Sequence, residues 1–151
     1  RERQHMAWKN DSNDSRMIEF APNGYPDKLA HKQADCMRGA VLLAQNDSEV
    51  DDIVMITHTI PHTVGMVADN HEWGHLNGAY MNTLMQSVWI ADEQNKIKAW
   101  CFGHTHYHCD DYREDIRFIN NARGYYAYKY GAYGGLKQID TTEQYRSAFE
   151  A

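Results

Sequence analysis

The sequence predicts an α/β fold, and two patterns in the 151-residue chain carry this prediction. Two short apolar runs, 53–56 and 97–102, have the composition of strands that are buried on both faces, as in a parallel sheet. A helical pattern lies between them, and a strand–helix–strand order of this length joins parallel strands. We therefore expect a parallel sheet with helices packed against it.

The first predicted helix begins at Pro26, after a polar segment 1–25, and is about 20 residues long. Its apolar side chains recur at three- and four-residue spacing: Leu29, Ala30, Ala34, Met37, Val41 and Ala44. Asn46-Asp47-Ser48 ends the pattern, and the first apolar run follows it. This segment is therefore expected to pack one face against the sheet.

The second predicted helix follows a long loop, 59–75. Its apolar positions occur once per turn, at Leu76, Tyr80, Leu84 and Val88. Beyond the second apolar run, 116–120 and 136–139 alternate in polarity and are expected to be short strands.

The composition excludes several classes of protein. Leu, Ile, Val and Phe number only 25, but ten Tyr, seven Met and four Trp raise the hydrophobic content to 42%. Aromatic side chains bury large areas, so a folded chain is expected, although its aliphatic core would be thin for an independent domain. No apolar run approaches the roughly 18 residues of a membrane helix, so no membrane partner is expected.

The net charge and the cysteine content further limit the class of protein and its cellular location. The net charge of −6 argues against a broad basic surface for nucleic acid. The same net charge is compatible with a small site whose positive charge comes from metal ions. Three cysteines without a Cys-x-x-Cys pair favour a reducing compartment, so a cytoplasmic location is expected.

Histidines concentrate at the ends of the two apolar runs. His58 follows the first run, and His104 and His106 follow the second. Ligands bind at the carboxyl ends of parallel strands, and an extended backbone would point residues i and i+2 to one side. Neutral imidazole binds Zn, Mn, Fe or Co. We therefore predict a metal site at these three histidines, the alternative being that each is an ordinary polar loop residue.

These residues also carry a family resemblance. Gly103-His104-Thr105-His106 resembles the last metal motif of the calcineurin-like metallophosphoesterases, and 57–62 resembles the preceding one. Segments 76–80, 111–112 and 121–125 resemble, in the same order, parts of a bacterial and phage branch of that family. The similarity extends from about residue 8 to residue 140 of the chain.

The resemblance implies a fold and an activity. The fold would be the C-terminal portion of the family's α/β/β/α sandwich, with residues 1–151 forming the C-terminal part of a single domain. The activity would be metal-dependent hydrolysis of a phosphomonoester or phosphodiester, using a hydroxide activated by two divalent ions. His58 and His104 would bind one ion and His106 the other. The resemblance does not distinguish Mn, Fe, Zn and Ni.

The chain also departs from the family pattern. The upstream motifs Asp-x-His, Gly-Asp-x-x-Asp and Gly-Asn-His-Glu are absent from their expected places. The general-acid histidine and the remaining ligands are therefore expected in a missing N-terminal half, and this chain alone is expected to be inactive. Two alternatives stay open: a non-catalytic structural or binding module that retains the fold, and a metal-dependent nuclease, which the acidic charge disfavours.

Two further residues are candidates for contact with a phosphate-ester substrate. Arg123 could stabilise negative charge that develops on the phosphoryl group, or it could be a surface arginine bonded to loop carbonyls. His62 could face the substrate, or it could form a hydrogen bond within its own loop. The sequence leaves both alternatives open.

Overall fold

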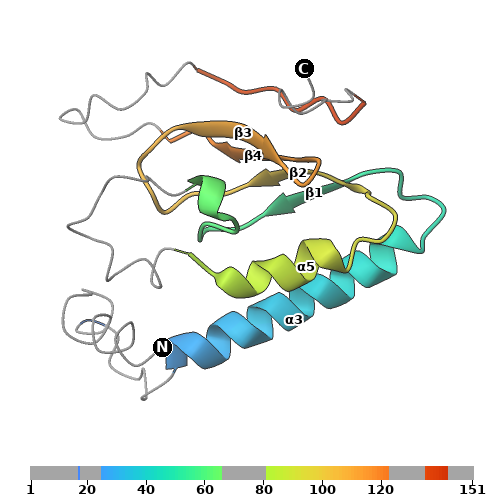
Figure 1. Ribbon diagram of the computed structural model, residues 1–151, viewed down its shortest axis with the longest axis horizontal. Coiled ribbons are helices and arrows are strands. Elements are labelled where there is room, and N and C mark those ends of the chain that lie inside the picture. The colour runs from blue at the N-terminus through green and yellow to red at the C-terminus, as the bar shows by residue number, and fades with distance from the viewer. Residues whose placement is uncertain (1–16, 18–24, 66–80, 123–134, 143–151) are drawn as a thin grey trace.

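The computed structural model describes residues 17, 25–65, 81–122 and 135–142. These residues form a mixed α/β fold around a four-stranded sheet with the strand order β1-β2-β4-β3 (Figure 1). The regular elements are α3 (Tyr25–Gln45), β1 (Ile53–Ile56), η1 (Thr63–Gly65), η3 (Thr83–Met85), α5 (Gln86–Ile90), β2 (Ile97–Cys101), β3 (Cys109–Arg113) and β4 (Ile116–Asn120).

Helix α3 confirms the helix predicted from Pro26 onward. Ala34 and Val41 are buried on the face that packs against the core. At its C-terminal end, the buried Gln45 side chain donates to the Ala91 carbonyl at 2.7 Å and accepts from the Gln94 amide at 3.3 Å. These hydrogen bonds fix the end of α3 to the turn that follows α5. No helix among the described residues is long and apolar enough to cross a membrane.

The parallel pairing of the two apolar runs is confirmed, because β1 pairs with β2 in parallel. On its other side, β2 pairs in parallel with β4. The expectation that β1 is buried on both faces is wrong. Met55 is 8% exposed, whereas Val54 is 41% and Ile56 76% exposed. The reason is that α3 and α5 lie on one side of the sheet (Figure 1), so side chains of β1 that point to the other side stay in solvent.

Strand β3 is an element that the sequence patterns did not predict. It pairs with β4 in an antiparallel hairpin whose last pair is Arg113 and Ile116. The two loop residues, Glu114 and Asp115, have φ values of 52° and 60°, as in a type I′ turn. Residues 114–115 are Glu-Asp and not the Asn-Gly or Asp-Gly pair that usually marks this turn, which explains why the sequence did not predict the hairpin.

Two predicted elements need correction. Residues 136–139 form no strand, and Leu136 is 97% exposed. This segment is joined to the sheet by hydrogen bonds of the Arg117 and Lys137 side chains and not by strand pairing. The second helix begins later than predicted, because Met81 forms a parallel bridge with Ile60 and the Asn82 side chain caps η3 by accepting from the Leu84 amide at 3.1 Å. Residues 76–80 of the predicted helix lie outside the described residues.

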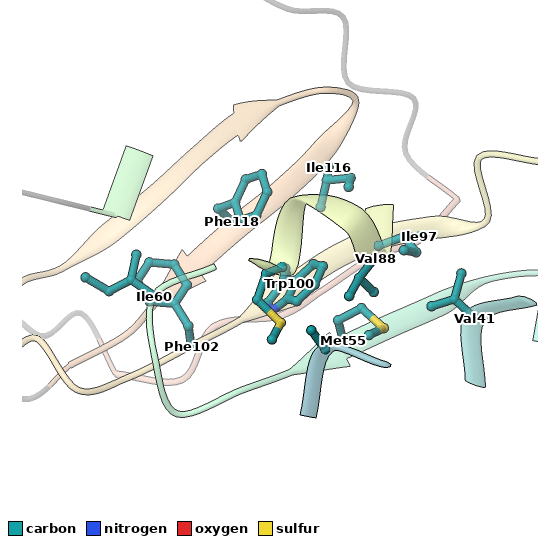
Figure 2. Packing of buried hydrophobic residues seen from close by; sticks show 11 residues of the cluster. Val41, Met55, Ile60, Val88, Ile97, Trp100, Phe102, Ile116 and Phe118 are labelled. Carbon is teal, nitrogen blue, oxygen red and sulfur yellow. The ribbon is translucent and has the colours of Figure 1, made fainter. Parts of the chain in front are cut away.

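The core is built around aromatic side chains. Trp100 and Phe118 are fully buried at the centre of the sheet face that α5 covers, and Figure 2 shows them with aliphatic neighbours such as Val88. Trp89 meets Trp100 edge to face at a centroid distance of 5.9 Å, and Trp100 stacks with Phe118 at 6.3 Å. Large aromatic rings therefore supply much of the buried area in a chain with few aliphatic residues.

Candidate functional site

The candidate site lies where the parallel strands β1 and β2 end. The parallel hydrogen bonding continues past both strands, because the Thr57 amide donates to the Cys101 carbonyl at 2.9 Å. One step further, the Gly103 amide donates to the His58 carbonyl at 3.0 Å. The backbone therefore holds His58 beside Gly103, and the next residue along the chain is His104.

The structure brings together two of the three predicted metal ligands. His58 Nε2 lies 3.1 Å from His104 Nδ1, and the ring centroids are 4.9 Å apart at an interplanar angle of 63°. The φ of His104 is +67°, in the left-handed region that non-glycine residues seldom adopt. Backbone conformations of this kind concentrate at functional sites. The pair thus joins two segments separated by 46 positions in the sequence.

The spacing of these two ring nitrogens fits shared binding of one ion. Two imidazole nitrogens about 2.1 Å from a common ion, at an angle of about 90–109°, would be about 3.0–3.4 Å apart. The observed 3.1 Å lies within that range. Among the described residues, however, no group of three or more His, Cys, Asp or Glu side chains could hold a metal ion. The described residues therefore bring two candidate ligands together without a third.

The expected backbone around His106 is wrong. An extended chain was expected to point residues 104 and 106 to one side, but residues 104 and 105 form a bend and His104 has a positive φ. Strand alternation therefore does not relate the two rings. His106 is exposed, and the structure does not join it to His58 and His104 in a three-ligand group.

Thr57 supports the site and was not singled out from the sequence. Its hydroxyl accepts a hydrogen bond from Trp100 Nε1 at 3.0 Å and donates one to the Thr59 carbonyl at 2.8 Å. The residue before His58 is thereby fixed to the buried centre of the sheet. Threonine at a strand end is common, so only the contact with a tryptophan 43 positions away reveals this role.

His62 is packed among aromatic rings. Its ring stacks on Phe118 at 5.0 Å and lies 5.4 Å from Trp89. The Val64 amide donates to His62 Nδ1 at 3.0 Å, which is the loop hydrogen bond that the sequence left open as an alternative. Burial lowers the pKa of His62 from its ordinary value of 6.5. Because Nδ1 accepts the hydrogen bond from Val64, the proton of the neutral ring is on Nε2.

The other predicted substrate residue, Arg123, lies outside the described residues. Cys109, the first residue of β3, is unsuited to ionise, because burial, followed by the charges of Asp111 and Asp110, raises its pKa to about 11. Its Sγ contacts the carbonyl oxygens of Val64 and Phe118 at 3.8 Å each. The neutral thiol therefore packs against these two carbonyl groups.

The described residues thus place a two-histidine centre at the carboxyl edge of parallel strands, where α/β proteins bind ligands. The centre combines a close pair of ring nitrogens with an unusual backbone conformation at His104. No protein-family model, curated protein or solved structure matches this chain.

Proposed function

We propose that the protein is a metal-dependent phosphoric ester hydrolase in which His58 and His104 bind one divalent ion and His106 binds a second. The observation that carries this proposal is the 3.1 Å approach of His58 Nε2 and His104 Nδ1 at the ends of two parallel strands. The Gly-His-Thr-His motif at 103–106 supports the same assignment through its resemblance to the calcineurin-like metallophosphoesterases.

We also propose that the fold is the C-terminal portion of that family's α/β/β/α sandwich. The support comes from the sheet face opposite the helices, where Val54 and Ile56 of β1 are 41% and 76% exposed. A second sheet packed on this face would bury both side chains. The N-terminal half of such a domain would supply that sheet and the ligands that the described residues lack.

The chemistry divides between the ions and the chain. Two divalent ions, when bound, would polarise the phosphoryl oxygens and supply a hydroxide for attack on phosphorus. The chain holds His58 through the backbone ladder and His104 through its left-handed conformation. Arg123 would offset negative charge that develops on the phosphoryl group. The substrate is a phosphate monoester or diester.

A second candidate function is a non-catalytic binding or structural module. The absence of a three-ligand group among the described residues favours it, because two imidazoles alone bind metal weakly. In this alternative the His58–His104 pair would bind an ion weakly or not at all, and without catalysis.

Hydrolysis of an aryl phosphate ester in the presence of Mn²⁺ by the complete natural protein tests the proposal. The His104→Ala and His106→Ala variants should lose activity while their circular dichroism spectra remain native. His31→Ala, a change of an exposed histidine on α3, should retain it. Unchanged activity in both site variants would refute the ligand assignment. Absence of hydrolysis in the wild type, together with Mn²⁺ binding that depends on His58 and His104, would favour the binding module.

A further inference from the structure

A buried amide at the end of β4 contacts the histidine motif directly. Asn120 is 3% exposed, and its Nδ2 donates to the Thr105 carbonyl oxygen at 2.7 Å and lies 3.1 Å from Thr105 Oγ1. Thr105 is the residue between His104 and His106. The Asn120 side chain, 15 positions further along the chain, is thus hydrogen-bonded to the central residue of the 104–106 segment.

The segment that Asn120 contacts has a strained conformation. The Thr105 amide donates to the Gly103 carbonyl at 2.8 Å, which closes a three-residue turn centred on His104. The φ of +67° at His104 makes this the rare γ-turn with a positive central φ. Such a turn costs about 1–3 kcal/mol at a non-glycine residue and persists only where its surroundings enforce it.

Asn120 is well placed to enforce the turn. The adjacent Ile119 carbonyl accepts from the Phe102 amide at 2.9 Å, so the end of β4 is fixed to the end of β2. From this rigid base the Asn120 carboxamide holds both the carbonyl and the hydroxyl of Thr105. Thr105 can then stay in the position that the turn at His104 requires.

We propose that Asn120 is a positioning residue that maintains the γ-turn at His104 and thereby keeps His104 Nδ1 directed at His58 Nε2. The effect on metal binding rests on the proposed function, whereas the effect on the two rings does not. Asparagine suits this role because its amide donates two hydrogen bonds. A carboxylate at the same place would set its oxygen against the Thr105 carbonyl oxygen.

The test compares Asn120→Asp, which keeps the shape but removes the donors, with Asn121→Asp as a matched control. Asn121 follows directly and donates to the Gly135 carbonyl at 2.8 Å instead. Nuclear Overhauser effects between the ring protons of His58 and His104 in the metal-free protein report the ring approach. Zn²⁺ titration followed by calorimetry reports affinity. Urea unfolding shows that each variant is folded.

Asn120→Asp should lose the Overhauser effects between the rings and weaken Zn²⁺ binding by about 10–100-fold, as loss of an outer-sphere partner does. Asn121→Asp should preserve both. A folded Asn120→Asp protein with unchanged ring contacts and Zn²⁺ affinity would overturn the positioning role and leave the metal site intact. Lost ring contacts in a protein whose wild type binds no Zn²⁺ would support the positioning role and count against the proposed function.

A second variant keeps the proposal open to refutation if Asn120→Asp fails to fold. Thr105→Val removes the hydroxyl and retains the carbonyl, so it should weaken the ring contacts and reduce Zn²⁺ affinity severalfold. Unchanged ring contacts in this variant, combined with an unfolded Asn120→Asp protein, would make Asn120 a general stability residue and overturn the proposal.

Discussion

Arg117 binds Asp110 through two parallel hydrogen bonds across the β3–β4 hairpin, from Nε to Oδ1 at 2.7 Å and from Nη2 to Oδ2 at 3.0 Å. Lys137 Nζ adds a third contact with Oδ2 at 2.9 Å, and Arg117 Nη1 donates to the Gln138 carbonyl at 3.2 Å. One carboxylate thereby joins the hairpin to the 135–142 segment. Paired, partly buried carboxylates of this kind make stability depend on pH.

Acid should remove the contribution of Asp110 to stability. The Arg117 hydrogen bond, opposed by burial and assisted by Lys137, lowers the pKa of Asp110 from 3.8 to about 2. Because the folded pKa is below the unfolded one, the stabilisation is full above pH 4 and is lost as the pH falls from about 4 to 2. Urea unfolding across this range should show a loss in the wild type that Asp110→Asn lacks. Asp111→Asn, the control at the neighbouring residue, should still lose stability over this range. Equal losses of stability in the wild type and in Asp110→Asn would show that Asp110 is not the group responsible.

The β3–β4 turn offers a stabilising substitution. Asp115 has a φ of 60° at the second loop position, where type I′ turns favour glycine. Asp115→Gly should therefore raise the free energy of unfolding by about 0.5–1 kcal/mol, because relief of the left-handed strain exceeds the entropy that glycine adds to the unfolded chain. Ser87→Gly in α5 serves as the opposite control and should destabilise. Thermal unfolding measures the stability of both variants. A destabilised Asp115→Gly protein would contradict the claim that strain at Asp115 lowers the stability of the wild type.

Thr57→Val should destabilise the protein by about 1–3 kcal/mol, because it leaves the buried Trp100 Nε1–H without its acceptor. Thr57→Ser keeps the hydroxyl and should cost much less. Urea unfolding followed by tryptophan fluorescence measures both variants. Equal stability of the valine and serine variants would mean that this hydrogen bond contributes little.

His62 should add a pH dependence at milder acidity. Burial lowers its pKa below 6.5, so the unfolded chain binds the proton more strongly and stability falls as the pH decreases below about 6.5. Nearby Glu114 and Asp111 oppose this shift and Arg113 assists it. The melting temperature should decline less between pH 8 and 5 in His62→Phe than in the wild type. An equal decline in the two proteins would show that His62 does not cause this pH dependence. His31→Gln, on an exposed helix face, should decline as the wild type does.

The sequence predicted the parts of the structure that depend on local pattern. Hydrophobic spacing located α3 and the two parallel strands, and strand-end position brought His58 and His104 together as expected. The backbone at His104 could not be predicted, because it depends on contacts with Thr105 that come from a different strand. The pattern that places residues i and i+2 on one side holds only while the chain stays extended.

Other errors have equally specific causes. Strand β3 carries two consecutive aspartates and ends in a turn without glycine, so neither its composition nor its loop indicates a hairpin. Residues 136–139 have the alternation of a strand but lie against Arg117 and Asp110 through side-chain contacts. Burial of β1 depends on what covers its second face, and a strand's own sequence does not specify that.

The exposed side of β1 has a practical consequence for handling the protein. Strand β1 lies at the end of the described strand order, and its four residues, Ile-Val-Met-Ile, include no charge or proline that would block pairing with another molecule. An uncharged, β-branched edge is a template for intermolecular strand pairing. We expect concentration-dependent aggregation of this chain in isolation, measurable by light scattering. Ile56→Lys, at a position already 76% exposed, should suppress it with little loss of stability.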